Sequence, residues 1–218
     1  MYIIIVLDCK ILILAVKPQN VASILKEISP YFSTDKLIVS IAAGINTHFI
    51  AGFLGDNSRI IRVMPNTPAF VKEGMSVICK AGKAKDADLE EVRNIFKSIG
   101  EVEELSENYF NAVTAMSGSG PAYILLMIEA LMDAGINTGL SKDISLLLAS
   151  QTVLGSAKLL KETKEHPAEL KNKICSPAGT TIAGLYKLEK GGFRGLVMEA
   201  VKAAKDRSEE IEKQYGSN

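Results

Sequence analysis

The first half of the chain alternates short apolar runs with amphipathic stretches. Runs of aliphatic and β-branched residues predict strands that are buried on both faces. We expect such strands at Lys10–Val16, Leu37–Ala42 and Arg59–Met64, with a further apolar run at Met75–Cys79. Helical spacing of apolar residues appears at Val21–Ile28, Asn46–Gly52 and Asp86–Ser98. This alternation predicts a doubly wound parallel sheet with helices on its faces.

From about Ser106 onward, helical patterns replace the strand patterns. Pro121–Ala134 is apolar on nearly all sides, so we expect both faces of this helix to be buried. Ile144–Lys161 carries small residues that let helices pack closely, and further helices are expected at Thr180–Glu189 and Phe193–Lys213. A monomer would leave such helices poorly covered, which favours burial against a partner subunit. We therefore expect an α/β domain at residues 1–105 and an all-helical domain at 106–218.

Amino-acid composition argues against several classes of function. The chain has 218 residues, of which 47% are hydrophobic, enough for a sizeable core. Its 25 basic and 25 acidic residues argue against binding to a nucleic-acid backbone, and the absence of Trp argues against base stacking. Two histidines and three separated cysteines, Cys9, Cys79 and Cys175, argue against a metal site. So few cysteines fit a reducing cytoplasm.

The N-terminal segment is very apolar. Met1–Val16 contains Asp8 and Lys10 and is shorter than the ~20 residues that a membrane-spanning helix needs. No basic region precedes it, as one would in a signal peptide. We therefore expect a buried strand here and no membrane partner. Met1–Leu7 is expected to cover part of the edge of Lys10–Val16 as a substitute strand, because Tyr2–Val6 has high β-propensity.

The residues that follow the strands are the first candidates for ligand binding, because ligands of doubly wound sheets bind at the carboxyl ends of the strands. Small residues there let a flat ring approach the backbone, Lys17 adds a positive charge, and the amide of Asn66 can donate and accept. Ordinary loops would have the same composition and remain the alternative. The segments are Ala15-Val16-Lys17-Pro18, Ile41-Ala42-Ala43-Gly44 and Met64-Pro65-Asn66-Thr67-Pro68.

Two segments rich in small residues precede expected helices in the second half. They are Met116-Ser117-Gly118-Ser119-Gly120-Pro121-Ala122 and Ser176-Pro177-Ala178-Gly179-Thr180-Thr181. Pro121 suits the first position of a helix, with Ser119 or Gly120 as its cap. The free N–H groups and positive dipole end of a helix start favour a carboxylate or a phosphate, although a plain cap remains the alternative.

Cys175 and the histidines are poor candidates for catalysis. No histidine lies near Cys175 in the sequence to activate it, so a structural thiol is favoured. His48 falls in a short expected helix, and His166 precedes Pro167 in an expected polar loop. We expect both to be solvated or locally bonded.

Six segments together resemble the pyrroline-5-carboxylate reductase family. They are ILAVKPQN at Ile13–Asn20, SIAAGI at Ser40–Ile45, RVMPNTPAFVKEG at Arg62–Gly74, VTAMSGSGPAYI at Val113–Ile124, SPAGTTIAGL at Ser176–Leu185 and LEKGGFRG at Leu188–Gly195. Each is weak alone, and their order and spacing carry the resemblance. It implies a Rossmann domain followed by a helical domain that interlocks with a second subunit. It also implies a cytoplasmic homodimer or larger homo-oligomer that reduces 1-pyrroline-5-carboxylate to L-proline with NADPH or NADH.

The resemblance also implies roles for individual residues. Cofactor contacts would come from Ala15, Val16, Lys17, Pro18, Ile41, Ala42, Ala43, Asn66 and Lys173. Substrate contacts would come from Glu107, Ser117, Ser119, Gly179, Thr180 and Thr181. Thr181 is the catalytic candidate, because its hydroxyl would hydrogen-bond the ring nitrogen that gains a proton. Glu107 would face the cationic iminium, with a plain helix-start carboxylate as the alternative.

The start of the chain departs from the family. The family opens with a strand, a G-x-G-x-x-G loop and a helix, whereas no such loop occurs in the nucleotide half of this sequence. A βαβ unit takes ~30 residues, so we expect a truncated Rossmann domain with impaired cofactor binding. A catalytically inactive dimerisation partner is one alternative, and a β-hydroxyacid dehydrogenase is another. The segment SPAGTTIAGL argues against the latter, which would need a general base such as Lys in the helical domain.

Overall fold

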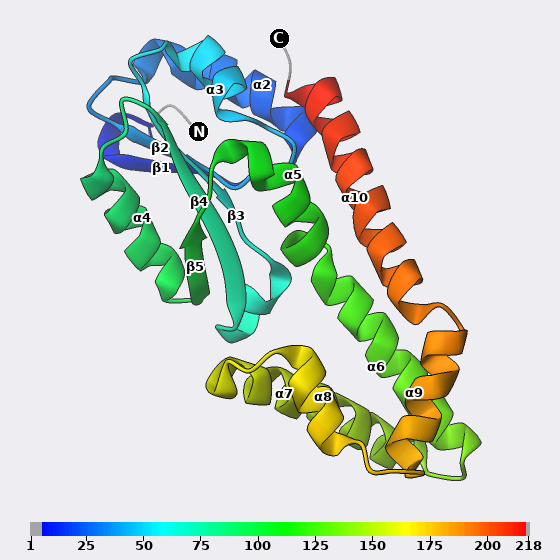
Figure 1. Ribbon diagram of the computed structural model, residues 1–218. Helices are drawn as coiled ribbons and strands as arrows, with labels where there is room; N and C mark the ends of the chain where they lie inside the picture. Colours follow the sequence, from blue (N-terminus) through cyan, green and yellow to red (C-terminus); the bar gives the residue numbers. More distant parts are fainter. Residues whose placement is uncertain (1–5, 217–218) are drawn as a thin grey trace. The chain divides into compact units, whose positions relative to one another are not determined.

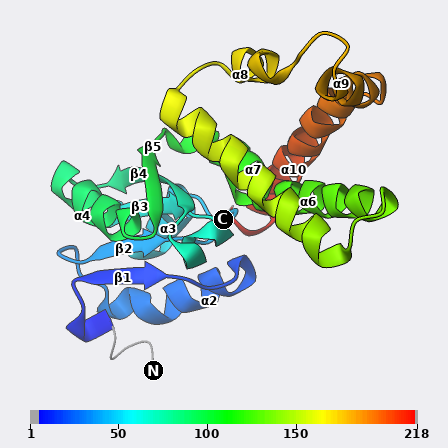
Figure 2. The ribbon, with the colours of Figure 1, turned by 90° about the horizontal axis from the view of Figure 1, so that it is seen from below.

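The computed structural model describes residues 6–216, in which a five-stranded sheet with flanking helices is followed by a series of helices (Figure 1). The strands are β1 (Ile11–Leu14), β2 (Leu37–Ser40), β3 (Arg59–Met64), β4 (Gly74–Gly82) and β5 (Gly100–Glu104). Their spatial order is the sequence order, as Figure 2 shows for β1 to β4. Residues 6–8 are helical, so the substitute strand expected at Met1–Leu7 is wrong at Val6 and Leu7, and the rest of that segment lies outside the described residues.

The sheet is mostly parallel, with one exception. β1–β2, β2–β3 and β4–β5 pair in parallel, whereas β3 and β4 are antiparallel. The expectation of a wholly parallel sheet is therefore corrected at this pair. The segment between β3 and β4 holds only the short 3-10 helix η2 (Thr67–Val71), and a parallel crossover needs about a dozen residues or more. Strand β5 was not predicted, because only Val102 of its sequence GEVEE is buried.

Helices cover both faces of the sheet (Figure 1). On one face, α2 (Pro18–Ile28) and α3 (Thr47–Leu54) pack with Ile38 and Ile60. On the other face, α4 (Asp86–Lys97) packs with Val39 and Ile61. Neighbouring residues of a strand point to opposite faces, so fully apolar strands are required. This Rossmann-type arrangement confirms the expected fold class.

The second half of the chain is helical, as expected. Its elements are η3 (Glu107–Tyr109), α5 (Phe110–Val113), the π-helix η4 (Thr114–Gly118), α6 (Gly120–Asn137), α7 (Lys142–Thr163), α8 (Pro167–Ile174), α9 (Thr180–Lys190) and α10 (Phe193–Tyr215). Helix α8 was not predicted. His166, expected in a polar loop, caps it, and its Nδ1 accepts a hydrogen bond from the Ala168 N–H at 3.2 Å.

The chain forms two compact units. The sheet unit comprises the described residues up to Pro121 together with those from Val201 onward, and the helical unit is Ala122–Ala200. Helices α6 and α10 therefore each contribute to both units. The division into residues 1–105 and 106–218 remains an expectation from the sequence.

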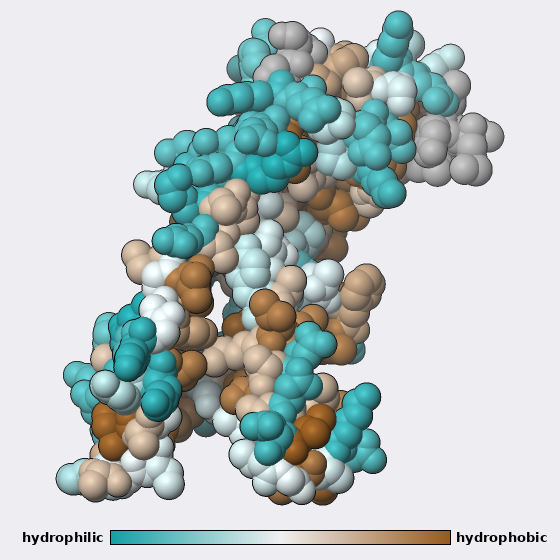
Figure 3. Space-filling model, turned by 90° about the vertical axis from the view of Figure 1, so that its right-hand side faces the viewer, coloured by the Kyte–Doolittle hydropathy of each residue, from teal (hydrophilic) through white to brown (hydrophobic). Residues whose placement is uncertain are grey.

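The helical unit has almost no core of its own. Helices α6, α8 and α9 bury no residue, and α7 buries only Ser145 and Ala149. Large apolar side chains are exposed instead, and Figure 3 shows such brown residues in its lower part. On α6 and α7 they include Ile124, Leu125, Leu126, Leu146, Leu147, Leu148 and Leu154. Among the described residues, the helical run Glu107–Asn137 is the one stretch long and apolar enough to cross a membrane, by length and composition only.

Candidate functional site

Eight candidate cofactor residues lie at one edge of the sheet. They directly follow β1, β2 and β3, which are parallel neighbours, so their carboxyl ends meet at the same edge. The eight are Ala15, Val16, Lys17, Pro18, Ile41, Ala42, Ala43 and Asn66. The ninth candidate, Lys173, lies in α8 of the helical unit and pairs there with Glu165 at 2.5 Å. Its contact with a cofactor stays a prediction.

The loop between β2 and α3, residues 41–46, has little room for larger side chains. Gly44 has a φ of +71°, and a Cβ at this position would lie 2.5 Å from Cγ2 of Ile211 in α10. At the end of the loop, the Asn46 side chain caps α3 by accepting a hydrogen bond from the Phe49 N–H at 2.8 Å. The loop is therefore shaped by helix α3 and by helix α10.

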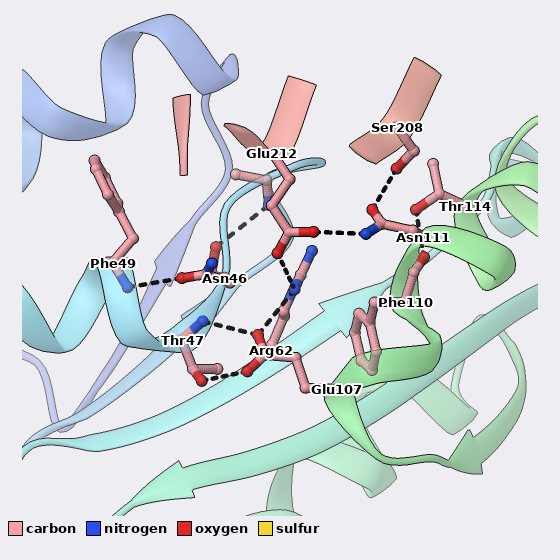
Figure 4. Close-up of polar contacts among 12 residues, drawn as sticks. Asn46, Thr47, Phe49, Arg62, Glu107, Phe110, Asn111, Thr114, Ser208 and Glu212 are labelled. Atoms are coloured by element: carbon pink, nitrogen blue, oxygen red, sulfur yellow. Dashed lines mark hydrogen bonds and ion pairs between the residues drawn. The ribbon is translucent and has the colours of Figure 1, made fainter. Parts of the chain in front are cut away.

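A buried ion pair lies beside this loop (Figure 4). Oε1 of Glu107 accepts hydrogen bonds from Nη1 of Arg62 at 2.8 Å and from the Thr47 N–H at 2.7 Å. Oε2 accepts from the Thr47 hydroxyl at 2.5 Å. The Arg62 side chain is 3% exposed, and its guanidinium lies 4.7 Å from the ring centre of Phe110. Sequence patterns identified Glu107 but not Arg62.

Helix α10 extends this network. Oε1 of Glu212 lies 3.9 Å from Nη1 of Arg62, and its Oε2 accepts a hydrogen bond from Nδ2 of Asn111 at 2.6 Å. The Ser208 hydroxyl donates to Oδ1 of Asn111 at 2.7 Å. These contacts attach the C-terminal part of α10 to β3 and α5 (Figure 4). Residues so far apart in sequence leave no local pattern that could reveal such contacts.

The hydrogen bonds of Glu107 in the structure differ from the contact that the sequence suggested. Both of its carboxylate oxygens are engaged by Arg62 and Thr47. The expected contact with a substrate iminium stays a prediction, and the structure supplies Arg62 as the cation that faces this carboxylate.

Helix α6 begins at Gly120 (Gly120–Asn137), within the segment where the sequence predicts a helix start. The π-helix η4 leads directly into it, so a helical run extends from Glu107 to Asn137. The Ser119 N–H donates to the Thr114 carbonyl at 2.8 Å, and the Ser117 hydroxyl donates to the Val113 carbonyl at 3.1 Å. The expected set of free N–H groups at this segment is therefore wrong, because helical bonding continues through it. π-turns of this kind are frequent at functional sites.

Asn66 connects this π-helix to the sheet. Pro121 has no N–H with which to bond the Ser117 carbonyl four residues earlier. Nδ2 of Asn66 donates to that carbonyl at 3.0 Å, and Oδ1 of Asn66 accepts from the Met75 N–H at 2.8 Å. Asn66 thus joins the end of β3 to both β4 and the segment that holds Ser117.

Replacing Asn66 with aspartate should destabilise the sheet unit by about 1–3 kcal/mol, because a carboxylate oxygen would face the Ser117 carbonyl in place of a donor. The free energy of unfolding, measured by urea denaturation, reports the loss. Asn94→Asp on the exposed side of α4 is the matched control and should change stability by less than about 0.5 kcal/mol. Equal stability of the two variants would contradict the connecting role of Asn66.

The second segment rich in small residues does begin a helix. Gly179 is the N-cap of α9, and Thr180 and Thr181 are its first residues. A Cβ at position 179 would lie 2.2 Å from the Ser176 hydroxyl oxygen and 3.2 Å from the Ser176 carbonyl oxygen, so a larger residue would displace the Ser176 side chain. N–H groups in the first turn of a helix have no partner within the helix. The arrangement suits a carboxylate, and the contact with substrate stays a prediction.

The Cys79 thiol is not available as a nucleophile. Cys79 lies in β4, and burial raises its pKa to about 12, so it stays protonated. Cys175 follows α8 and is half-buried. Within residues 6–216, no group of three or more His, Cys, Asp or Glu side chains is placed to hold a metal ion.

The sheet edge carries small side chains and one positive charge. Ala42 and Gly44 are buried and Ala43 is half-buried, whereas the exposed Lys17 caps α2 without a side-chain hydrogen bond. The printed sequence offers no G-x-G-x-x-G loop for the pyrophosphate. A Rossmann-type sheet unit with this edge, followed by a helical unit, defines the class of dinucleotide-dependent oxidoreductases.

Comparison with known proteins narrows the class. The family model for pyrroline-5-carboxylate reductase dimerisation matches residues 107–211. The pyrroline-5-carboxylate reductase of Glycine max is 47% identical over 207 residues, which are 95% of this chain and 75% of that relative. The reductase of Escherichia coli is 42% identical over 203 residues, covering 93% and 76%.

Solved structures agree with these relatives. The crystal structure of Plasmodium falciparum pyrroline carboxylate reductase with NADP bound has a TM-score of 0.89 at 40% identity, covering 95% of this chain and 79% of that one. The Streptococcus pyogenes enzyme has a TM-score of 0.89 at 35% identity, covering 96% and 79%. This chain therefore belongs to the pyrroline-5-carboxylate reductase family. The matched dimerisation region indicates self-association.

Proposed function

We propose that this chain is an NAD(P)H-dependent pyrroline-5-carboxylate reductase, which reduces the C=N bond of 1-pyrroline-5-carboxylate to give L-proline. The observation that carries the proposal is 47% identity to the Glycine max reductase over 95% of the chain. The likeness to a reductase with NADP bound, at a TM-score of 0.89, supports the same cofactor class. The reaction places the protein in proline biosynthesis.

The nicotinamide end of the cofactor would bind at the carboxyl ends of β1, β2 and β3. Small side chains in the loop 41–46 admit the ring, and Lys17 offers a positive charge. When bound, the dinucleotide supplies the hydride, and the protein orients the ring and excludes water. In this proposal, Asn66 shapes the edge through Ser117 and Met75, and Lys173 provides a further cofactor contact.

The substrate would bind at the start of α9. The N–H groups in the first turn of α9, which starts at Thr180, have no partner within the helix and suit its carboxylate, since the positive end of a helix dipole favours an anion. The Thr181 hydroxyl would hydrogen-bond the ring nitrogen that is protonated in the product. Ser117 and Ser119 would wall the pocket from the other subunit.

The proposal includes an obligate homodimer, with larger homo-oligomers possible, in the cytoplasm. Its support is the exposed apolar surface of α6 and α7 together with the match to a dimerisation family. A partner chain would cover the apolar run Glu107–Asn137, so this run needs no membrane. We assign nicotinamide binding to residues 1–105 and substrate binding and dimerisation to 106–218. The balanced charge gives no support to nucleic-acid binding.

A catalytically inactive dimerisation partner is the second candidate function. The observation that favours it is that the matching family model, over residues 107–211, is a dimerisation model. Titration of this chain with NADPH separates the two functions. Saturable binding together with NADPH oxidation in the presence of 1-pyrroline-5-carboxylate supports the reductase, and absence of both supports the inactive partner.

Thr181→Ala should lower turnover by roughly tenfold to a hundredfold, because a hydrogen bond to a charged group contributes about 1.5–3 kcal/mol. The measurement is the rate of NADPH oxidation at saturating substrate. Thr181→Ser keeps the hydroxyl and should retain most activity. Thr163→Ala, which removes a hydroxyl bonded to the Leu159 carbonyl at the end of α7, serves as the control and should leave turnover unchanged. Equal losses in Thr181→Ala and Thr181→Ser would show that the hydroxyl is not the active feature.

A further inference from the structure

The carboxylate of Glu107 joins three elements around the candidate nicotinamide edge. It accepts two hydrogen bonds from Thr47, the first residue of α3, and one from Arg62 of β3, and it stands at the start of η3. Thr47 directly follows the loop 41–46, and Arg62 lies two residues before the end of β3 (Figure 4). One side chain therefore links the end of the loop 41–46 to strand β3 near the candidate edge.

We propose that Glu107 is a positioning residue that anchors the loop 41–46 for cofactor binding, acting through Thr47 and Arg62 rather than by contact with substrate. The expected effect on cofactor binding rests on the proposed function. The anchoring of the loop 41–46 by Glu107 does not depend on that function.

Charge makes this anchor strong. Hydrogen bonds to an ionised acceptor are about twice as strong as those between neutral groups. Arg62 is 3% exposed and the Glu107 side chain 29%, so solvent screens the pair only in part. Ala42 and Ile45 pack into the core beneath the loop. At the end of the loop, Thr47 is held by the charged carboxylate through both its N–H and its hydroxyl.

Helix α10 holds the middle of the same loop. Ile211 packs so closely on Gly44 that no Cβ fits between them. Glu212, on the next residue, is the second carboxylate near Arg62, at 3.9 Å. If Glu107 loses its charge, Arg62 still faces Glu212. The variant Glu107→Gln should therefore fold while its loop is loosened.

Glu107→Gln is compared with Asp88→Asn, a carboxylate of the same kind elsewhere in the sheet unit. Asp88 accepts a hydrogen bond from the Lys85 N–H at 2.7 Å and pairs with Arg59, the first residue of β3. It thus also joins an arginine to a backbone N–H at a helix start. Arg59 lies at the opposite end of β3 from Met64 and the candidate edge. Asp88→Asn therefore controls for loss of a carboxylate and of stability.

The first measurement is hydrogen exchange of the amides of residues 41–50 without cofactor. Glu107→Gln should speed exchange there by about tenfold or more, since the charged acceptor of the Thr47 N–H is lost. Asp88→Asn should leave these amides unchanged. Thr47→Val, which removes the hydroxyl but keeps the backbone bond, should give a smaller increase.

The second measurement is NADPH binding to the same variants. The dissociation constant should rise about tenfold in Glu107→Gln and stay unchanged in Asp88→Asn, and the KM for 1-pyrroline-5-carboxylate should change little in both.

Unchanged exchange in residues 41–47 of Glu107→Gln would overturn the inference. A raised KM for 1-pyrroline-5-carboxylate with unchanged NADPH binding would also overturn it, in favour of a direct substrate contact. If the unaltered chain binds no NADPH, the proposed function fails, whereas the exchange measurement still decides whether Glu107 anchors the loop.

Discussion

Replacing Arg62 with methionine should lower the free energy of unfolding by about 3 kcal/mol, because removal of one partner of a buried ion pair leaves an uncompensated charge. Here two carboxylates, Glu107 and Glu212, would lose their common cation. Their side chains are 29% and 23% exposed, so partial hydration keeps the effect at the lower end of the usual range of about 3–5 kcal/mol. The stacking of the guanidinium on Phe110 would be lost as well.

The matched control is Arg93→Met on α4. Arg93 also pairs with two carboxylates, Glu90 and Glu104, but these are 60% and 46% exposed. Its loss should cost no more than about 1 kcal/mol. Urea denaturation of both variants gives the comparison. Similar losses in the two would mean that the cluster around Arg62 is no more important than a surface pair. Adding Glu107→Gln to Arg62→Met should recover part of the loss, since one unpaired charge disappears.

Association of the chain is expected to be all or none. Ser145 and Ala149 are the only residues of the helical unit that are buried, too little for it to remain folded alone. Sedimentation at micromolar concentration should therefore show no folded monomer. The variant Leu125→Glu/Leu147→Glu puts charges on exposed apolar positions of α6 and α7 and should abolish the dimer together with much of the helical circular dichroism signal.

Packing within the helical unit supports this expectation. A largely apolar cavity of about 210 Å³ lies between α6 and α7, and its lining includes Leu131, Leu148 and Ala149. The Ser145 hydroxyl beside it is buried without a hydrogen-bond partner. Ile95→Glu on α4 of the sheet unit, where the side chain is 40% exposed, is the control and should leave sedimentation unchanged. A stable, folded monomer of the unaltered chain would contradict the expectation.

Sequence patterns predicted the elements whose buried side chains form a clear apolar run. β3 was expected at its observed bounds, because Ile60, Ile61 and Val63 are buried and leave an unbroken apolar run. Helix α8 and strand β5 were missed, since α8 buries no residue and β5 buries only Val102. Strand β4 was expected as the apolar run Met75–Cys79, but its antiparallel direction was not, because the length of the preceding connection, rather than apolar periodicity, sets that direction.

The candidate site was predictable where it follows from strand ends, and not where it depends on distant contacts. Parallel pairing of β1, β2 and β3 is enough to bring Lys17, Ala42 and Asn66 to one edge. The partners of Arg62 come from η3 and α10, and no pattern within a short window connects them. The Gly- and Ser-rich segment gave the start of α6 at Gly120, but not the π-helix that precedes it and takes up the N–H group of Ser119.

The sheet unit is built from two separate stretches of the chain, residues up to Pro121 and residues from Val201 onward. This division affects how the protein folds during synthesis. Ser208, Ile211 and Glu212 complete contacts with Asn111, Gly44 and Arg62, yet they follow the helical unit in the chain. At about 5–20 residues per second, roughly 100 further residues take about 5–20 s to emerge after Pro121. During that interval the nascent sheet unit lacks the helix that covers Gly44 and Arg62. Molecular chaperones that bind exposed apolar surface therefore have a defined period in which to act, and it ends with the last turns of α10.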